Sequence, residues 1–144
     1  MLCFAFVPLM ALGHSAENDG LNSENLNLFL LVEGQEQNKD GSLSVKINHD
    51  LIFSKNSPLR SAKQKPVKLK LNLPVIGETI AIINDSNYST QQVRSHIGKI
   101  EGKSGGKLFL TVMNKTFHGL ALLNNGRKYY ITKNKGNTML LRKK

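Results

Sequence analysis

The chain contains 144 residues, of which 40% are hydrophobic, so it can build one hydrophobic core and is too short for two comfortable ones. That apolar content excludes a fully disordered chain, which could not bury enough surface to offset the entropy lost on ordering. The net charge of +10 is uneven, because residues 1–50 carry seven acids against two lysines, whereas residues 51–144 carry 18 basic side chains against three acids. The chain's own acidic part, an acidic partner, nucleic acid or an anionic surface would each match the basic part, and charge alone does not choose among them.

Residues 1–16 contain no Asp, Glu, Lys or Arg, and Leu2 to Leu12 form an apolar run that is as long as a signal peptide and too short to span a bilayer. The segment predicts a signal peptide and a secreted or periplasmic protein without a transmembrane anchor, although no basic residue precedes the run. A buried N-terminal element is the alternative, because an apolar run does not distinguish the two. Cys3, the only cysteine, lies in this segment, so the mature chain would form no disulfide.

Residues 17–53 predict an acidic N-terminal arm with one or two strands. The apolar patch at 26–34 fits a strand at least as well as a helix, residues 42–47 alternate between apolar and polar, and Asp40-Gly41 between them is typical of a hairpin turn. Residues 54–66 hold two prolines and four Lys or Arg with little to bury. They predict a basic linker or long loop that separates the arm from the rest of the chain.

Residues 67–144 predict a basic β-meander. Val67 to Leu73 alternates strictly, Glu78 to Ile83 forms a second strand, and a turn is expected at 84–87. From Ser95 onward about five short strands are separated by turns at 103–106, 114–116, 124–126 and 134–137, with Asn125-Gly126 as the strongest hairpin signal. The fold class is therefore all-β, an antiparallel meander that forms a sandwich or a barrel-like roll, with no clear helix beyond a turn at 90–94.

The usual signatures of catalysis, cofactor binding and metal binding are missing from the sequence. There is no HExxH, CxxC or GxSxG motif and no glycine-rich loop before a helix, and His96 and His118 are expected on the solvent side or rim of strands. We therefore expect no enzyme activity and no catalytic, cofactor-binding or metal-binding residues. Aromatic residues among basic ones could stack on single-stranded nucleic acid, but export removes the usual targets, so we do not expect this partner.

A spaced pattern of glycines and alternating strands runs from Tyr88 to Leu141. Its positions are Gly98, Ile100 and Gly102, Leu108, Leu110 and Val112, Gly119 and Leu120, and Tyr130 and Ile131. This pattern resembles the propeptide core of reprolysin-type (adamalysin-like) zinc metallopeptidases, and residues 67–83 resemble the strand pair that precedes it. The resemblance implies a protein that binds a zinc metallopeptidase as inhibitor or folding assistant. The chain departs from the family in having no cysteine here to ligate zinc and no peptidase after Lys144, which leaves open a truncated precursor or a complete protein.

The basic side chains are the candidates for partner binding: Lys99, Lys103, Lys107, Arg142, Lys143 and Lys144. The glycines expected to shape turns or strands are Gly98, Gly102, Gly119 and Gly126. The alternative function is a basic extracellular or periplasmic module that binds an anionic envelope polymer or an acidic protein through Lys68, Lys70, Lys99, Lys103 and Lys107. The predicted core positions are Val67, Leu69, Leu71, Ile100, Leu108, Leu110 and Leu120.

Overall fold

A computed structural model describes residues 26–30, 38–90, 92–133 and 138–144. The predicted signal peptide and the predicted turn at 134–137 lie outside these residues. The described part contains nine strands, a short α-helix and a 3-10 helix. The strands are β1 (Phe29–Leu30), β2 (Leu43–Ile47), β3 (Val67–Leu73), β4 (Gly77–Tyr88), β5 (Val93–Ile100), β6 (Gly106–Met113), β7 (Thr116–Leu123), β8 (Lys128–Lys133) and β9 (Thr138–Lys143), and the helices are α1 (His49–Phe53) and η2 (Pro58–Ser61).

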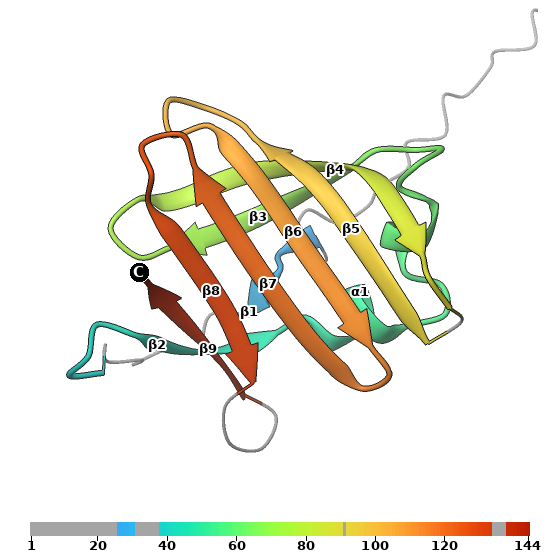
Figure 1. Ribbon diagram of the computed structural model, residues 1–144, viewed down its shortest axis with the longest axis horizontal. Coiled ribbons are helices and arrows are strands. Elements are labelled where there is room, and N and C mark those ends of the chain that lie inside the picture. Colours follow the sequence, from blue (N-terminus) through green and yellow to red (C-terminus); the bar gives the residue numbers. More distant parts are fainter. Residues whose placement is uncertain (1–25, 31–37, 91, 134–137) are drawn as a thin grey trace, which may run out of the picture.

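All nine strands belong to one antiparallel sheet with the order β1-β2-β9-β8-β7-β6-β5-β4-β3. The two ends of the sheet approach each other, because the Leu28 N–H donates a 3.0 Å hydrogen bond to the Lys70 carbonyl of β3 and Asn27 forms a parallel bridge with Lys70. The sheet is therefore a nearly closed barrel (Figure 1). The all-β meander is confirmed as a barrel, whereas the sandwich is wrong because the strands make one continuous sheet.

The alternating pattern of β3 shows why these residues form half-buried strands. Val67, Leu69, Leu71 and Leu73 are buried, and the lysines and the asparagine between them point outward. Six of the seven predicted core positions are buried in the same way. Leu120 is the exception. Its neighbours in β7, Gly119 and Ala121, face the interior of the barrel, so Leu120 lies on the outer face. A strand has only two faces, and placing one residue on the wrong face reverses its neighbours.

Three predicted turns can be compared with the structure. The expected turn at 84–87 is part of β4, which continues to Tyr88 through a register shift between Ile83 and Asp85. At 90–94 the Val93 N–H donates a 3.3 Å hydrogen bond to the Thr90 carbonyl, the bond from residue i+3 to residue i that closes a turn, and β5 begins at Val93. The Asn125-Gly126 turn joins β7 to β8 as expected, with Gly126 at φ 84°, a conformation that glycine adopts at little cost.

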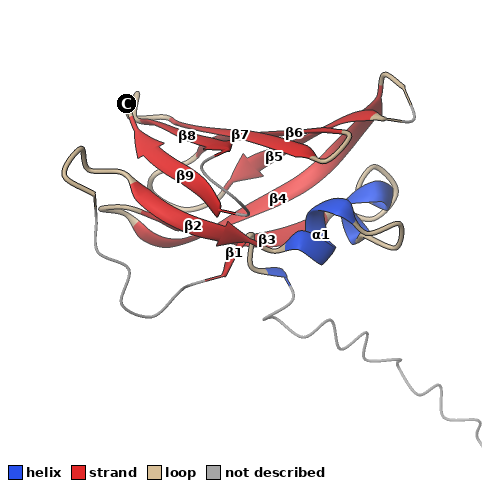
Figure 2. Ribbon diagram, turned by 90° about the horizontal axis from the view of Figure 1, so that it is seen from below, coloured by secondary structure: helices blue, strands red, loops and turns tan. Residues whose placement is uncertain are grey.

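Residues 48–66, called here the helical segment, connect β2 to β3. Asn48 caps α1 by accepting a hydrogen bond from the Leu51 N–H, and Ser57 caps η2 in the same manner. The expected linker at 54–66 thus contains η2, and its Leu59 and Ala62 are fully buried. η2 contacts β4, and Figure 2 shows the helical segment beside β3 and β4 at one end of the barrel. Strand β2, which lies in the predicted acidic arm, pairs with β9 inside the sheet, so this part of the arm is built into the barrel.

Candidate functional site

Four apolar side chains form a continuous line across the outer face of the barrel. Ile97 of β5 lies opposite Phe109 of β6, Phe109 opposite Leu120 of β7, and Leu120 opposite Tyr130 of β8. Their strand neighbours are buried, so all four point outward, and Ile97 keeps 38% of its surface exposed. We call Ile97, Phe109, Leu120 and Tyr130 the apolar row. An open hollow lined by Tyr130, Thr132, Arg142 and Lys144 extends it at the β9 side.

Lysines occupy the same outer face on β3 and, two residues away from the apolar row, on β5, β6 and β8. Lys68 of β3 lies opposite Ile82 of β4, Ile82 opposite Lys99, and Lys99 opposite Lys107. Leu122 follows Lys107 in the register, and Lys128 of β8 follows Leu122. We call Lys68, Lys99, Lys107 and Lys128 the lysine row. Since residues i and i+2 of a strand share a face, the lysine row runs directly beside the apolar row.

The pairing of Lys99 with Lys107 is unfavourable within the sheet. Directly opposite residues on neighbouring strands have Cβ atoms roughly 5 Å apart, and like charges at that spacing destabilise the pair. Both lysines are exposed, and neither makes an ion pair with any residue that the structure describes. Elsewhere the barrel does match its charges, as in the ion pair of 3.9 Å between Lys70 and Glu78. The repulsion between Lys99 and Lys107 costs stability that the fold does not require, and such a cost is typical of a functional surface.

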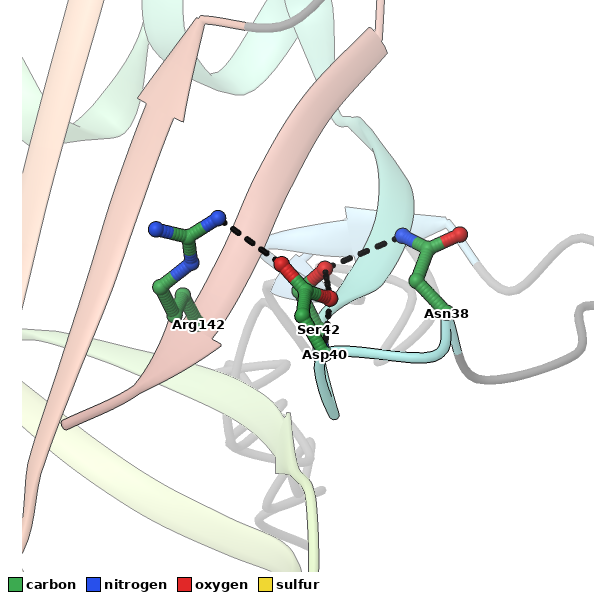
Figure 3. Close-up of polar contacts among 4 residues, drawn as sticks. All are labelled: Asn38, Asp40, Ser42 and Arg142. Carbon is green, nitrogen blue, oxygen red and sulfur yellow. Dashed lines mark hydrogen bonds and ion pairs between the residues drawn. The ribbon is translucent and has the colours of Figure 1, made fainter.

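Arg142 is bound within the chain instead of being free for a partner. Its Nη2 lies 2.8 Å from Asp40 Oδ2, and Figure 3 shows the guanidinium turned toward that carboxylate. The Ser42 N–H donates a 3.0 Å hydrogen bond to Asp40 Oδ1, and Asn38 Nδ2 donates to Ser42 Oγ at 3.0 Å. Hydrogen bonds from Ser42 and the charge of Arg142 lower the pKa of Asp40. Arg142 thus ties β9 to the loop that precedes β2.

The other predicted partner-binding residues occupy different parts of the surface. Lys103 is exposed in the loop between β5 and β6, and Lys143 is exposed near the end of β9. Lys144 Nζ lies 5.9 Å from the centre of the Tyr130 ring, within range of a cation–π contact. Of the predicted set, the fold brings Lys99 and Lys107 together from two different strands, and Arg142 and Lys144 line the same hollow at the end of the chain. The sequence reasoning missed Lys128 and the apolar row, because neither is visible until the register across the hairpins is known.

The two strand histidines, His96 and His118, were both expected on the solvent side or rim of their strands, and the structure places them differently. His96 of β5 is 0% exposed, which corrects its predicted solvent-side or rim position, whereas His118 is exposed on β7 as expected. Burial and the charges of Arg94 and Arg60 lower the pKa of His96 to about 4.

No group of three or more His, Cys, Asp or Glu side chains in the described residues could hold a metal ion.

Comparison of the chain with models of protein families, with curated proteins and with solved structures finds no match. The resemblance to metallopeptidase propeptides therefore stays a prediction from the sequence. Among the described residues, no helix has the length and apolar character needed to cross a membrane.

Proposed function

We propose that this chain is an exported, non-catalytic module that binds an acidic protein through the lysine row and the apolar row. The observation that carries the proposal is the unneutralised pair Lys99 and Lys107 next to Ile97 and Phe109. Carboxylates of a partner placed over the two lysines remove the repulsion between them. Electrostatic complementarity of this kind speeds association and selects the partner.

The apolar row favours a protein over a uniformly charged polymer. Ile97, Phe109, Leu120 and Tyr130 gain free energy only where a partner covers them with apolar surface, because burial of apolar area is the favourable term. Protein interfaces combine an apolar centre that includes aromatic side chains with a polar, charged rim. The two parallel rows have this composition. An anionic envelope polymer would engage the lysine row alone, and it is the competing partner in the test.

A zinc metallopeptidase is our specific candidate for the acidic partner. The support is the propeptide-like pattern of Gly98 to Ile131, which lies on β5 to β8, the strands that carry most of both rows. In this proposal the barrel covers an acidic substrate cleft and acts as inhibitor or folding assistant. Nothing in the mode of binding needs a zinc ligand from the chain.

The test compares two double variants that change charge by the same amount. Lys99→Glu/Lys107→Glu reverses the centre of the lysine row, and Lys55→Glu/Lys63→Glu reverses two exposed lysines of the helical segment as a matched control. A reprolysin-type peptidase is incubated with each protein, and both residual proteolysis and binding are measured at low and high salt. We expect the row variant to lose about tenfold or more in affinity, the control to bind as the original chain does, and salt to weaken binding.

The same variants separate the outcomes. Equal losses in both double variants would show that net charge, and not this face, drives binding. No inhibition and no binding of the peptidase would overturn the metallopeptidase as partner. Salt-dependent retention on an anionic polymer that is unchanged by Phe109→Ser would favour the polymer-binding module over an acidic protein.

A further inference from the structure

Two arginines, Arg94 of β5 and Arg60 of the helical segment, have no carboxylate partner among the described residues. Arg94, on the inward face of β5, retains 7% of its surface, and its Nη2 donates a hydrogen bond to the Ile52 carbonyl of α1. Its Nε is buried and has no hydrogen-bond partner among the described residues. Arg60 of η2 donates from Nε to the Ser54 carbonyl at 3.0 Å. Neither guanidinium forms an ion pair within the described part of the chain.

The nearby histidine has a free acceptor. Ser86 Oγ donates a 2.9 Å hydrogen bond to the Leu59 carbonyl, and the same oxygen lies 2.7 Å from His96 Nδ1. Because a hydroxyl has one proton, this network assigns the ring proton to Nδ1, which donates to Ser86 Oγ. Nε2 of the neutral ring is then an acceptor, and it is buried with no hydrogen-bond partner in the described part of the chain. Arg94 and His96 share the inward face of β5, two residues apart.

Tyr88 of β4 also contacts this region. The Tyr88 hydroxyl donates a 2.9 Å hydrogen bond to the Arg60 carbonyl of η2. Burial, with the charge of Arg60 as a second cause, lowers the pKa of Arg94, which is the direction expected for a cation that lacks a counter-charge. A buried guanidinium is costly unless it is paired. The planar fork of arginine donors matches the oxygens of phosphates and carboxylates.

We propose that the Arg60, Arg94 and His96 cluster binds a small oxyanion, with singly protonated phosphate as the preferred form. Its charged oxygens accept hydrogen bonds from Arg94 Nε and from Arg60, and its P–OH donates to His96 Nε2. Sulfate and acetate offer the acceptors but no proton at neutral pH, so they leave Nε2 unsatisfied and bind more weakly. Arg94 and His96 face the inside of the barrel, whereas the apolar and lysine rows face outward, so either proposal can fail without the other.

The test is a titration of the full chain with inorganic phosphate at constant ionic strength, followed by NMR of the His96 imidazole and the Arg94 Nε–H. We expect saturable shifts of both groups, affinity for phosphate about tenfold higher than for sulfate or acetate, and a His96 pKa that rises with bound phosphate. Arg94→Gln should abolish the response, and Arg127→Gln, a variant of the turn between β7 and β8, should keep it.

Three results would overturn the site. Shifts of His96 that chloride reproduces, or no saturable shift up to about 50 mM phosphate, would reject it. Equal affinities for phosphate and sulfate would reject the role of His96 Nε2. If Arg94→Gln does not fold, Arg60→Gln and the comparison of phosphate with chloride on the original chain decide the question.

Discussion

Replacing Gly119 by alanine should destabilise the barrel, and shortening Ile131 should restore much of the loss. A Cβ added at Gly119 would lie 2.5 Å from Ile131 Cδ1, with the next atoms of the same side chain at 3.2 and 3.3 Å. Gly119 on β7 and Ile131 on β8 are register partners, so hydrogen bonds of the sheet hold both in place. At Gly98 on β5 the added Cβ would lie 2.6 Å from Ile83 Cδ1 and also 2.7 Å from the Ile82 carbonyl oxygen. A side-chain methyl can be removed, but a backbone oxygen cannot.

The expected sizes follow from these contacts. Overpacking of a filled interior costs about 1–3 kcal/mol, and the loss of glycine's freedom in the unfolded chain offsets about 0.4–1 kcal/mol of it. Ile131→Val alone should cost about 0.5–1.5 kcal/mol through the missing methylene. Because that change removes the closest atom, Gly119→Ala/Ile131→Val should be more stable than the sum of its single variants by about 1 kcal/mol. The corresponding gain for Gly98→Ala/Ile83→Val should be smaller, since the Ile82 oxygen remains.

Urea unfolding of the two double-mutant cycles measures these free energies directly. Each kcal/mol lost should also lower the melting temperature by about 4 °C or slightly more for a domain of this size. An unchanged midpoint for Gly119→Ala would show that the strands are further apart than described. Equal rescue at both sites would refute the argument that the backbone oxygen limits Gly98.

Two further predictions concern the core and its response to acid. Leu110→Ala should cost about 2–5 kcal/mol, because Leu110 is 0% exposed, and Leu120→Ala on the apolar row much less; equal losses in urea unfolding would contradict their assigned faces. The pKa of His96 is about 4 in the folded chain against 6.5 normally, so the unfolded chain binds more protons between these values. Stability in phosphate-free buffer should fall as pH drops from about 6.5 through about 4, by on the order of 3 kcal/mol. His96→Gln should flatten the pH dependence, and an unchanged slope would contradict the depressed pKa.

The parts of the fold that the sequence predicted are those determined by neighbouring residues. The strict alternation of Val67 to Leu73 predicted β3 with its observed bounds, and Asn125-Gly126 predicted the turn between β7 and β8. Both signals arise within a few residues, because a half-buried strand and a tight turn restrict local sequence strongly. The order of strands in a meander then follows from successive hairpins.

The parts of the fold and of the candidate site that the sequence did not predict depend on contacts between distant segments. The five residues of α1 are too few to show a helical period, and Leu59 of the expected linker is buried only because the barrel end lies beneath it. His96 points inward because every second residue of β5 faces the interior. The sequence of β5 mixes polar and apolar residues on both faces, so it does not show which set is buried. The two rows of the candidate site need the register across β3 to β8, and no single strand contains it.

The pairing of β2 with β9 has a consequence for how the chain folds. From β3 to β9 each strand pairs with the next in sequence, so this sheet can grow one hairpin at a time with short loops to close. Joining Leu43 to Leu141 requires ends that are almost the whole described length apart, and the entropy of closing that loop opposes it. Closure should therefore be the late, slow step. Until it occurs, the open sheet leaves the edges of β3 and β9 unpaired, and a second copy of the chain can compete with β1 and β2 for those edges.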